Sequence, residues 1–394
     1  MRFHGKHFAN FIHLLSLEVC DHKFTRYQMK FRVFTALSIA ILALNFAGST
    51  LADGSKKKAA GADLVTMLPA SHGVVSIDVK RLLNEGLPTM LSSKPEWVAQ
   101  MNEGIDGFRG KTGLDLRMFD QAAVGVNVTD LGNGKFDLDP VVLAKGDFNA
   151  GSLIAIAKVA SDGKYREEKV GTHSLIIFSV KKAADKAAAK AGEVDGRTNS
   201  IMESVGDSLS EEVAVTALNS NTLAFGTVAR VRETLDRKTK ISPQLNALLA
   251  KYPNTIAKMA ATVPSGLSKF VPMENDEIGN NIDSIRAISG AFNVTPVETT
   301  FMLSAKTLQA AQAKSLYELM DGMMAWGGNL LSASKRDDQQ VFGRLLKSAK
   351  LSQKGTMIDL TLPVAQSDID SLIGMIKLKP ETEAEPKPDA ADPK

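Results

Sequence analysis

The segment that most constrains what this chain can fold into is residues 29–52, MKFRVFTALSIAILALNFAGSTLA, because it decides which residues belong to the mature protein. It has two basic residues near its start, an uninterrupted apolar and small-residue run over 33–44, and the small residues Thr50 and Ala52 near its end. This order is typical of a secretory signal peptide. We therefore expect cleavage after Ala52 and export to the bacterial periplasm or the medium.

An uncleaved membrane anchor is the alternative for this segment, since residues 33–52 carry no charge and about 20 apolar residues suffice to span a bilayer. We favour cleavage because polar and small residues from Asn45 onward shorten the apolar part, and a lysine-bearing stretch follows over 53–58. No cysteine stands at the cut, which argues against a lipoprotein anchor. The mature chain is expected to have no stable membrane span.

Residues 1–28 precede the signal and hold four of the six histidines and the only cysteine, Cys20. We interpret Met29 as the true start and residues 1–28 as a misassigned upstream extension; an unusually long basic leader is the alternative. After the leader is removed no cysteine remains, so an exported protein must depend on its hydrophobic core instead of disulfides. This composition fits the bacterial cell envelope.

The charge of the chain gives no sign of a nucleic-acid partner. The formal net charge is +3, but six of the 47 basic and two of the 44 acidic residues lie in the leader, so residues 53–394 have a net charge of −1. A near-neutral chain with well-mixed charges lacks the basic face that nucleic acid requires.

Alternating strand patterns and amphipathic helices predict an α+β protein. The expected strands lie at 74–79, 122–129, 140–148, 165–180 as a pair turning near Gly171, 213–217, 222–226, 287–295, 297–305 and 354–362. The expected helices lie at 80–84, 96–108, 150–160, 228–237, after Ser242-Pro243, from Leu308 to about Gly327, 339–349 and 367–376. Glycine- and asparagine-rich loops join several strands directly, which indicates antiparallel sheets with packed helices.

The two halves of the mature chain share a sequence pattern. Residues 125–129, GVNVT, match 291–295, AFNVT, and each is followed by a strand that ends in Ala-Lys. Gly171-Thr172 also matches Gly355-Thr356 at a later strand. We interpret the pattern as a diverged internal duplication into two similar halves; chance similarity between hairpins is the alternative.

These patterns divide the exported chain into a flexible spacer at 53–63, a first α+β half at 64–240 and a second at 241–377. Residues 378–394 form a tail rich in Pro, Glu, Ala and Lys without apolar periodicity. The tail is expected to be disordered because it has too little apolar surface to offset the entropy of ordering.

The sequence shows no recognisable catalytic or metal-binding motif, so we expect a protein that is not an enzyme and has no cofactor. Only His72 and His173 remain after the leader, without ligand-like spacing, and no G-x-S-x-G motif occurs. Gly110-Lys111-Thr112 resembles the end of a P-loop, but Ile105 stands where its first glycine belongs. Residues 130–139 have glycines where a calcium loop needs oxygen ligands.

Apolar surface is the remaining functional signal. The helix expected from Leu308 carries leucines and methionines at helical spacing, and methionine adapts to irregular apolar partners. The candidate apolar-ligand face consists of Leu316, Leu319, Met320, Met323 and Met324. We expect this stripe to pack on the sheet of the second half; lining a lipid or peptide groove is the alternative.

The opening LVTMLPASHGVVSIDVKRLL at 64–83, with the strand and helix order over 64–377, resembles uncharacterised exported bacterial proteins of α+β architecture. The resemblance implies export and fold and transfers no site residue. Three functions follow as hypotheses. The first is a non-catalytic envelope protein that binds or scaffolds another envelope protein, the second a periplasmic carrier of lipid or another apolar ligand, and the third a hydrolase.

Overall fold

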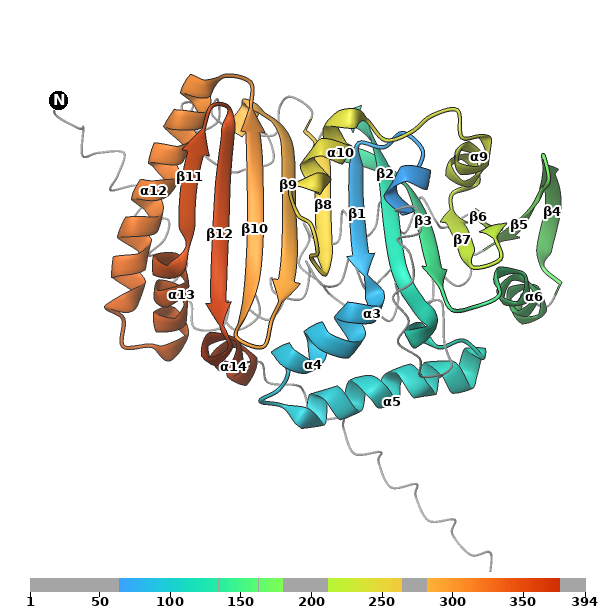
Figure 1. Ribbon diagram of the computed structural model, residues 1–394, viewed down its shortest axis with the longest axis horizontal. Helices are drawn as coiled ribbons and strands as arrows, with labels where there is room; N and C mark the ends of the chain where they lie inside the picture. The colour runs from blue at the N-terminus through green and yellow to red at the C-terminus, as the bar shows by residue number, and fades with distance from the viewer. Residues whose placement is uncertain (1–63, 133–134, 162, 180–211, 264–281, 376–394) are drawn as a thin grey trace, which may run out of the picture.

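The computed structural model describes residues 64–132, 135–161, 163–179, 212–263 and 282–375. The expected α+β class is confirmed, because in this part of the chain helices pack on one continuous antiparallel sheet of twelve strands in the order β11-β12-β10-β9-β8-β1-β2-β3-β7-β6-β5-β4 (Figure 1). The strands are β1 Gly73–Asp78, β2 Phe119–Gly132, β3 Lys135–Gly146, β4 Tyr165–Val170, β5 His173–Ser179, β6 Glu212–Asn219, β7 Thr222–Gly226, β8 Ala257–Thr262, β9 Ile285–Val294, β10 Glu298–Thr307, β11 Lys350–Lys354 and β12 Met357–Ala365.

The interior of the sheet contains the antiparallel pair β1 and β8, in which Val75 lies opposite Met259. Outward from this pair the order is β1-β2-β3 on one side and β8-β9-β10 on the other. The hairpins β5-β4 and β12-β11 form the two outer ends, and β7 and β6 are inserted on one side alone. This arrangement is compatible with the expected duplication, which stays a prediction.

Most expected strand pairs are confirmed, among them β2 with β3, β6 with β7 and β9 with β10. The expectation of one strand over 354–362 was wrong: Gly355 turns the chain between β11 and β12, and its φ of +59° suits a residue without Cβ. Strand β8, AKMAAT, was missed because three alanines and no Val or Ile give it a weak strand signal.

One face of the sheet is covered by η1 (Leu64–Met67), α9 (Val228–Asp236) and α10 (Pro243–Ala250). Leu64, Val65 and Leu68 bury almost completely against sheet residues of the same face, such as Val74 and Leu143. Helix α10 adds a second group of buried side chains to this core: Leu245, Leu248 and Leu249. We call this side of the sheet the η1 face.

The opposite face of the central strands is covered from one end of the sheet by short helices that follow β1. They are α3 (Val79–Arg81), the π-helix η2 (Leu82–Gly86) and α4 (Leu87–Met90), and α5 (Pro95–Thr112) then runs beside them, as Figure 1 shows. Farther along, η3 (Leu116–Met118) precedes β2 and α6 (Ala150–Ala160) follows β3. Val79, Ala150 and Ile256 are the most buried residues of this second core.

The same opposite face continues over β10, β12 and β11, because Ala257 pairs with Phe292 and Phe292 with Phe301. Here α12 (Ala310–Ser332), α13 (Asp337–Ser348) and α14 (Gln366–Met375) cover the outer strands (Figure 1). Helices α13 and α14 share a core with Trp97 of α5, which joins the C-terminal helices to the N-terminal half.

Four sequence expectations lie outside the described residues: the upstream extension 1–28, the signal peptide 29–52, the spacer 53–63 and the tail 378–394. Within the described residues no helix combines the length and the apolar character needed to cross a membrane.

Candidate functional site

The candidate stripe on α12 is divided between two environments. Leu316 is buried and, with Leu319 and Met320, packs against sheet residues including Ile358. Met323 is 45 % exposed on the same helix, and Met324 is half-buried. The structure therefore brings only the first part of the stripe to the sheet.

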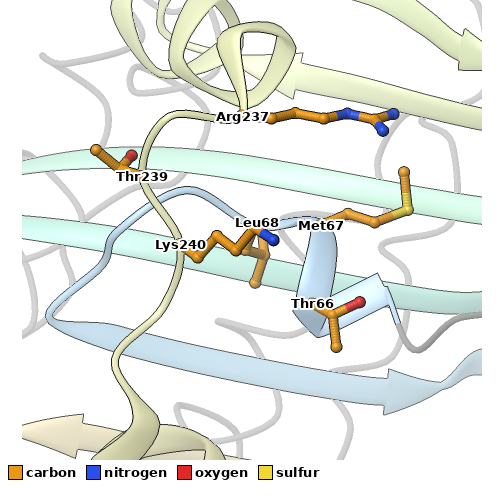
Figure 2. A pocket seen from close by; sticks show the side chains of 6 residues that line it. All are labelled: Thr66, Met67, Leu68, Arg237, Thr239 and Lys240. Atoms are coloured by element: carbon orange, nitrogen blue, oxygen red, sulfur yellow. The ribbon is translucent and has the colours of Figure 1, made fainter.

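A cavity of about 350 Å³ lies on the η1 face, between η1 and the segment that links α9 to α10. Six described residues line it: Thr66, Met67, Leu68, Arg237, Thr239 and Lys240 (Figure 2). Met67 and Leu68 supply an apolar floor, and Figure 2 shows the Arg237 side chain extending from the linking segment toward Met67 and the Lys240 side chain toward Leu68. We call this space the η1 cavity; its volume falls at the small end of the usual range for ligand pockets, about 300–1,000 Å³.

The end of α9 determines the shape of the cavity wall. Thr227 caps the start of the helix by accepting a hydrogen bond from the Arg230 amide, and the helix ends at Arg237, which has a φ of +51°. This left-handed position usually holds glycine, since a side chain there costs about 1–2 kcal/mol. An arginine at this position projects its side chain over the cavity despite that cost.

Two hydrogen bonds hold the cavity walls together. The Thr239 hydroxyl accepts a bond of 3.3 Å from the Ala70 amide, which ties the linking segment to the residues after η1. Arg230, which is fully buried, donates from Nη2 to the Ser71 hydroxyl at 2.7 Å and from Nη1 to Glu233. These bonds connect α9 and the linking segment to the residues that follow η1.

Only some of the cations near this cavity have a described carboxylate partner. Three cations of the α9 region each have a carboxylate partner: Arg230 with Glu233, Arg232 with Glu168 and Lys238 with Asp236. Arg237 and Lys240, which line the cavity, have no carboxylate partner among the described residues. The cavity thus combines an apolar floor with two cations that no described acid neutralises.

A second group of chemically active side chains lies on the η1 face beside α10, and we call Lys251, Tyr252, Ser304 and Asp359 the serine cluster. Lys251 Nζ lies 2.9 Å from both the Ser304 hydroxyl and an Asp359 oxygen. The Tyr252 hydroxyl donates to Ser304 at 3.0 Å, and Ser304 donates to Asp359. A smaller cavity of about 170 Å³ adjoins the cluster.

The electrostatics of the serine cluster do not suit nucleophilic catalysis. Burial opposes ionisation of Asp359, but hydrogen bonds from Ser304 and Lys251 outweigh it and hold the pKa of that carboxyl below its ordinary value. Lys251 Nζ is held by this carboxylate as well as by Ser304, whereas a general base needs a free acceptor aimed at the nucleophile. Ser304 also lies inside β10, paired on both sides, so its backbone serves the sheet and not an oxyanion hole.

The two histidines have structural partners. His72 Nδ1 accepts a hydrogen bond of 3.1 Å from the Val128 amide, and His173 Nδ1 lies 3.0 Å from the Ala217 carbonyl oxygen. Within the described ranges no three His, Cys, Asp or Glu side chains gather as metal ligands would. Gly110-Lys111-Thr112 forms the last turn of α5, which Gly113 ends with a φ of +71°, so the P-loop resemblance is a helix end.

The opposite face of the sheet carries a partly exposed apolar group, which we call the phenylalanine patch: Phe292, Phe301 and Leu303. The two aromatic rings lie 5.3 Å apart between centroids. Phe301 is 43 % exposed and Leu303 47 % exposed, although both belong to an interior strand. Sequence analysis missed the serine cluster and the η1 cavity, because each is assembled from segments far apart in the chain. It also missed this patch, which lies on the single hairpin β9-β10, because strand periodicity does not show which part of a sheet face the helices leave uncovered.

Comparison with known proteins assigns no family. No protein-family model and no curated protein matches the chain. Among solved structures, crystal form III of TP0453 aligns with a TM-score of 0.38 and 10% identity over 81% of this chain and 100% of that one. Crystal form IV aligns with a TM-score of 0.36 and 9% identity over 77% and 92%, and crystal form I with 0.36 and 10% over 80% and 98%. Similarity at this level assigns neither a family nor a function.

Proposed function

We propose that this chain is an exported, non-catalytic binding protein of the bacterial cell envelope that carries a small apolar ligand in the η1 cavity. The observation that carries the proposal is the cavity floor, formed by Met67 and Leu68 and bounded by a hydrogen-bonded wall. A concave apolar site with a few polar groups at its margin is the usual form of a small-molecule site.

The non-catalytic part of the proposal is supported by the serine cluster. Ser304 is bonded to Lys251, Tyr252 and Asp359, and Lys251 is itself engaged by Asp359. The cluster has a structural explanation, since its bonds fasten α10 to β10 and β12.

The test is native mass spectrometry of the protein purified from its own envelope fraction. We expect an apolar ligand to copurify with the natural protein and to be lost from Met67→Trp, which fills the cavity with a larger side chain. Ile156→Trp is the matched control, because it adds the same ring to an exposed position of α6. Equal ligand in both variants, or no ligand in the natural protein, would contradict the carrier function.

The phenylalanine patch favours a second candidate function, the scaffolding of another envelope protein. Exposed aromatic residues are enriched in protein interfaces, and Phe301 and Leu303 are both accessible. If this function holds, Phe301→Ser together with Leu303→Ser should abolish capture of a partner from envelope extracts while Met67→Trp leaves that capture intact.

A further inference from the structure

We infer that the ligand of the η1 cavity is an anionic amphiphile, a single apolar chain that ends in a carboxylate or a phosphate ester. This inference rests on the proposed function, because it names the ligand class of the same cavity. It comes from the two cations at the cavity and not from its apolar floor.

The first observation is that two cations of this segment have no described carboxylate partner, whereas their neighbours do. Over residues 230–240 the other arginines and Lys238 are each neutralised by a carboxylate, whereas Arg237 and Lys240 have no acidic partner among the described residues. Both side chains are exposed, and an anion bound by the two together gains charge-assisted hydrogen bonds from cations that form no ion pair in the described structure.

The second observation is the backbone at Arg237. Its positive φ is one of two among the described residues other than glycine, the other being that of Asn254, and asparagine tolerates this conformation well. A strained arginine beside a cavity points to a role for its side chain. The planar guanidinium suits bidentate binding of a carboxylate or a phosphate.

The third observation is the position of the charges relative to the floor. Figure 2 shows Arg237 and Lys240 leaving two positions of one segment, with the Arg237 side chain extending toward Met67 and the Lys240 side chain toward Leu68. An anionic head held by the two cations would leave its attached chain on Met67 and Leu68. An anion without a chain would leave this floor uncovered, and a neutral chain would leave both cations without a partner.

The experiment is calorimetric titration of the mature protein with decanoate, decyl phosphate, decan-1-ol and acetate. We expect decanoate and decyl phosphate to bind more tightly than decan-1-ol, and acetate to bind more weakly than either anionic amphiphile. Whichever of the two amphiphiles binds more tightly identifies the head, a free fatty acid or a phosphate-bearing lipid. Arg237→Gln and Lys240→Gln should each weaken binding of the preferred amphiphile about tenfold, which is the effect of losing one charge-assisted bond.

Lys238→Gln is the matched control, since it removes a positive charge from the same segment at a residue that does not line the cavity and is paired with Asp236. It should change the affinity less than about twofold because Lys238 does not line the cavity and its charge is already paired. Equal binding of decanoate and decan-1-ol, unaffected by Arg237→Gln and Lys240→Gln, would overturn the anionic ligand and leave the carrier function standing. Failure of all four compounds to bind would overturn both.

Discussion

Gly171 and Gly355 occupy corresponding turns at opposite ends of the sheet, and both have a φ of +59°. Gly171 joins β4 to β5 and Gly355 joins β11 to β12, each as the first residue of a two-residue hairpin loop followed by threonine. A hairpin loop of this kind requires a positive φ at its first position, which glycine adopts without steric cost.

Replacing either glycine by alanine should lower the free energy of unfolding by about 1 kcal/mol, because alanine is strained at positive φ. No heavy atom outside the turn lies within 4 Å of the added Cβ at either position, so the cost comes from the backbone alone. Urea unfolding of Gly171→Ala and Gly355→Ala should give similar losses. A large difference between the two alanine variants would argue against equivalent turns.

Arg230 and Ser71 allow a prediction about which of two substitutions is more destabilising. Ser71→Ala should destabilise the fold by about 1–3 kcal/mol, because it leaves a buried guanidinium with one acceptor fewer. Arg230→Met should cost less, since it also removes the buried charge and a buried Nε that has no hydrogen-bond partner in the described structure. Urea unfolding of the two variants decides the order, and a more harmful Arg230→Met would show that the ion pair with Glu233 dominates.

Residues of the α12 stripe should contribute to stability according to how deeply they are buried. Leu316→Ala should lower the free energy of unfolding by about 2–5 kcal/mol through lost burial and a residual cavity. Met323→Ala, at a position 45 % exposed on the same helix, should change it by less than about 0.5 kcal/mol. Urea unfolding measures both. A stable Leu316→Ala protein would contradict the assignment of this residue to the core.

Stability should depend on pH through Asp359. Its pKa is held below the ordinary value of 3.8, so the stabilisation is present above that value and is lost as the pH falls through the folded-state pKa. Asp359→Asn should therefore flatten the fall in melting temperature between about pH 5 and pH 2. Asp321→Asn, an exposed position on α12, is the control. If the melting temperature of Asp359→Asn fell at low pH as steeply as that of the natural protein, the carboxylate would contribute no net stabilisation.

Local periodicity predicted most of the secondary structure, because hairpins such as β6 with β7 form between residues close in sequence. It failed at β8, whose alanines become a strand only through pairing with β1 and β9. The single strand expected over 354–362 failed for a different reason. A turn was expected at Gly171 but not at the matching Gly355, although both glycines turn the chain.

The candidate sites were less predictable than the fold. The cavity joins Met67 to Arg237, and the serine cluster joins Lys251 to Asp359 across more than a hundred residues. No spacing rule relates such positions, because sheet order and not sequence distance brings them together. The positive φ of Arg237 was likewise unpredictable. Such a helix end is usually marked in the sequence by glycine, and here the residue is arginine.

The central position of β1 also determines when the sheet can be completed. Ile77 pairs with Ala257, which lies 180 residues later in the chain, so one side of β1 has no strand partner until β8 has been synthesised. At about 5–20 residues per second this interval lasts roughly 10 to 40 s. During that time the nascent chain exposes a strand edge that favours aggregation, which predicts dependence on a holding chaperone until residue 262 emerges.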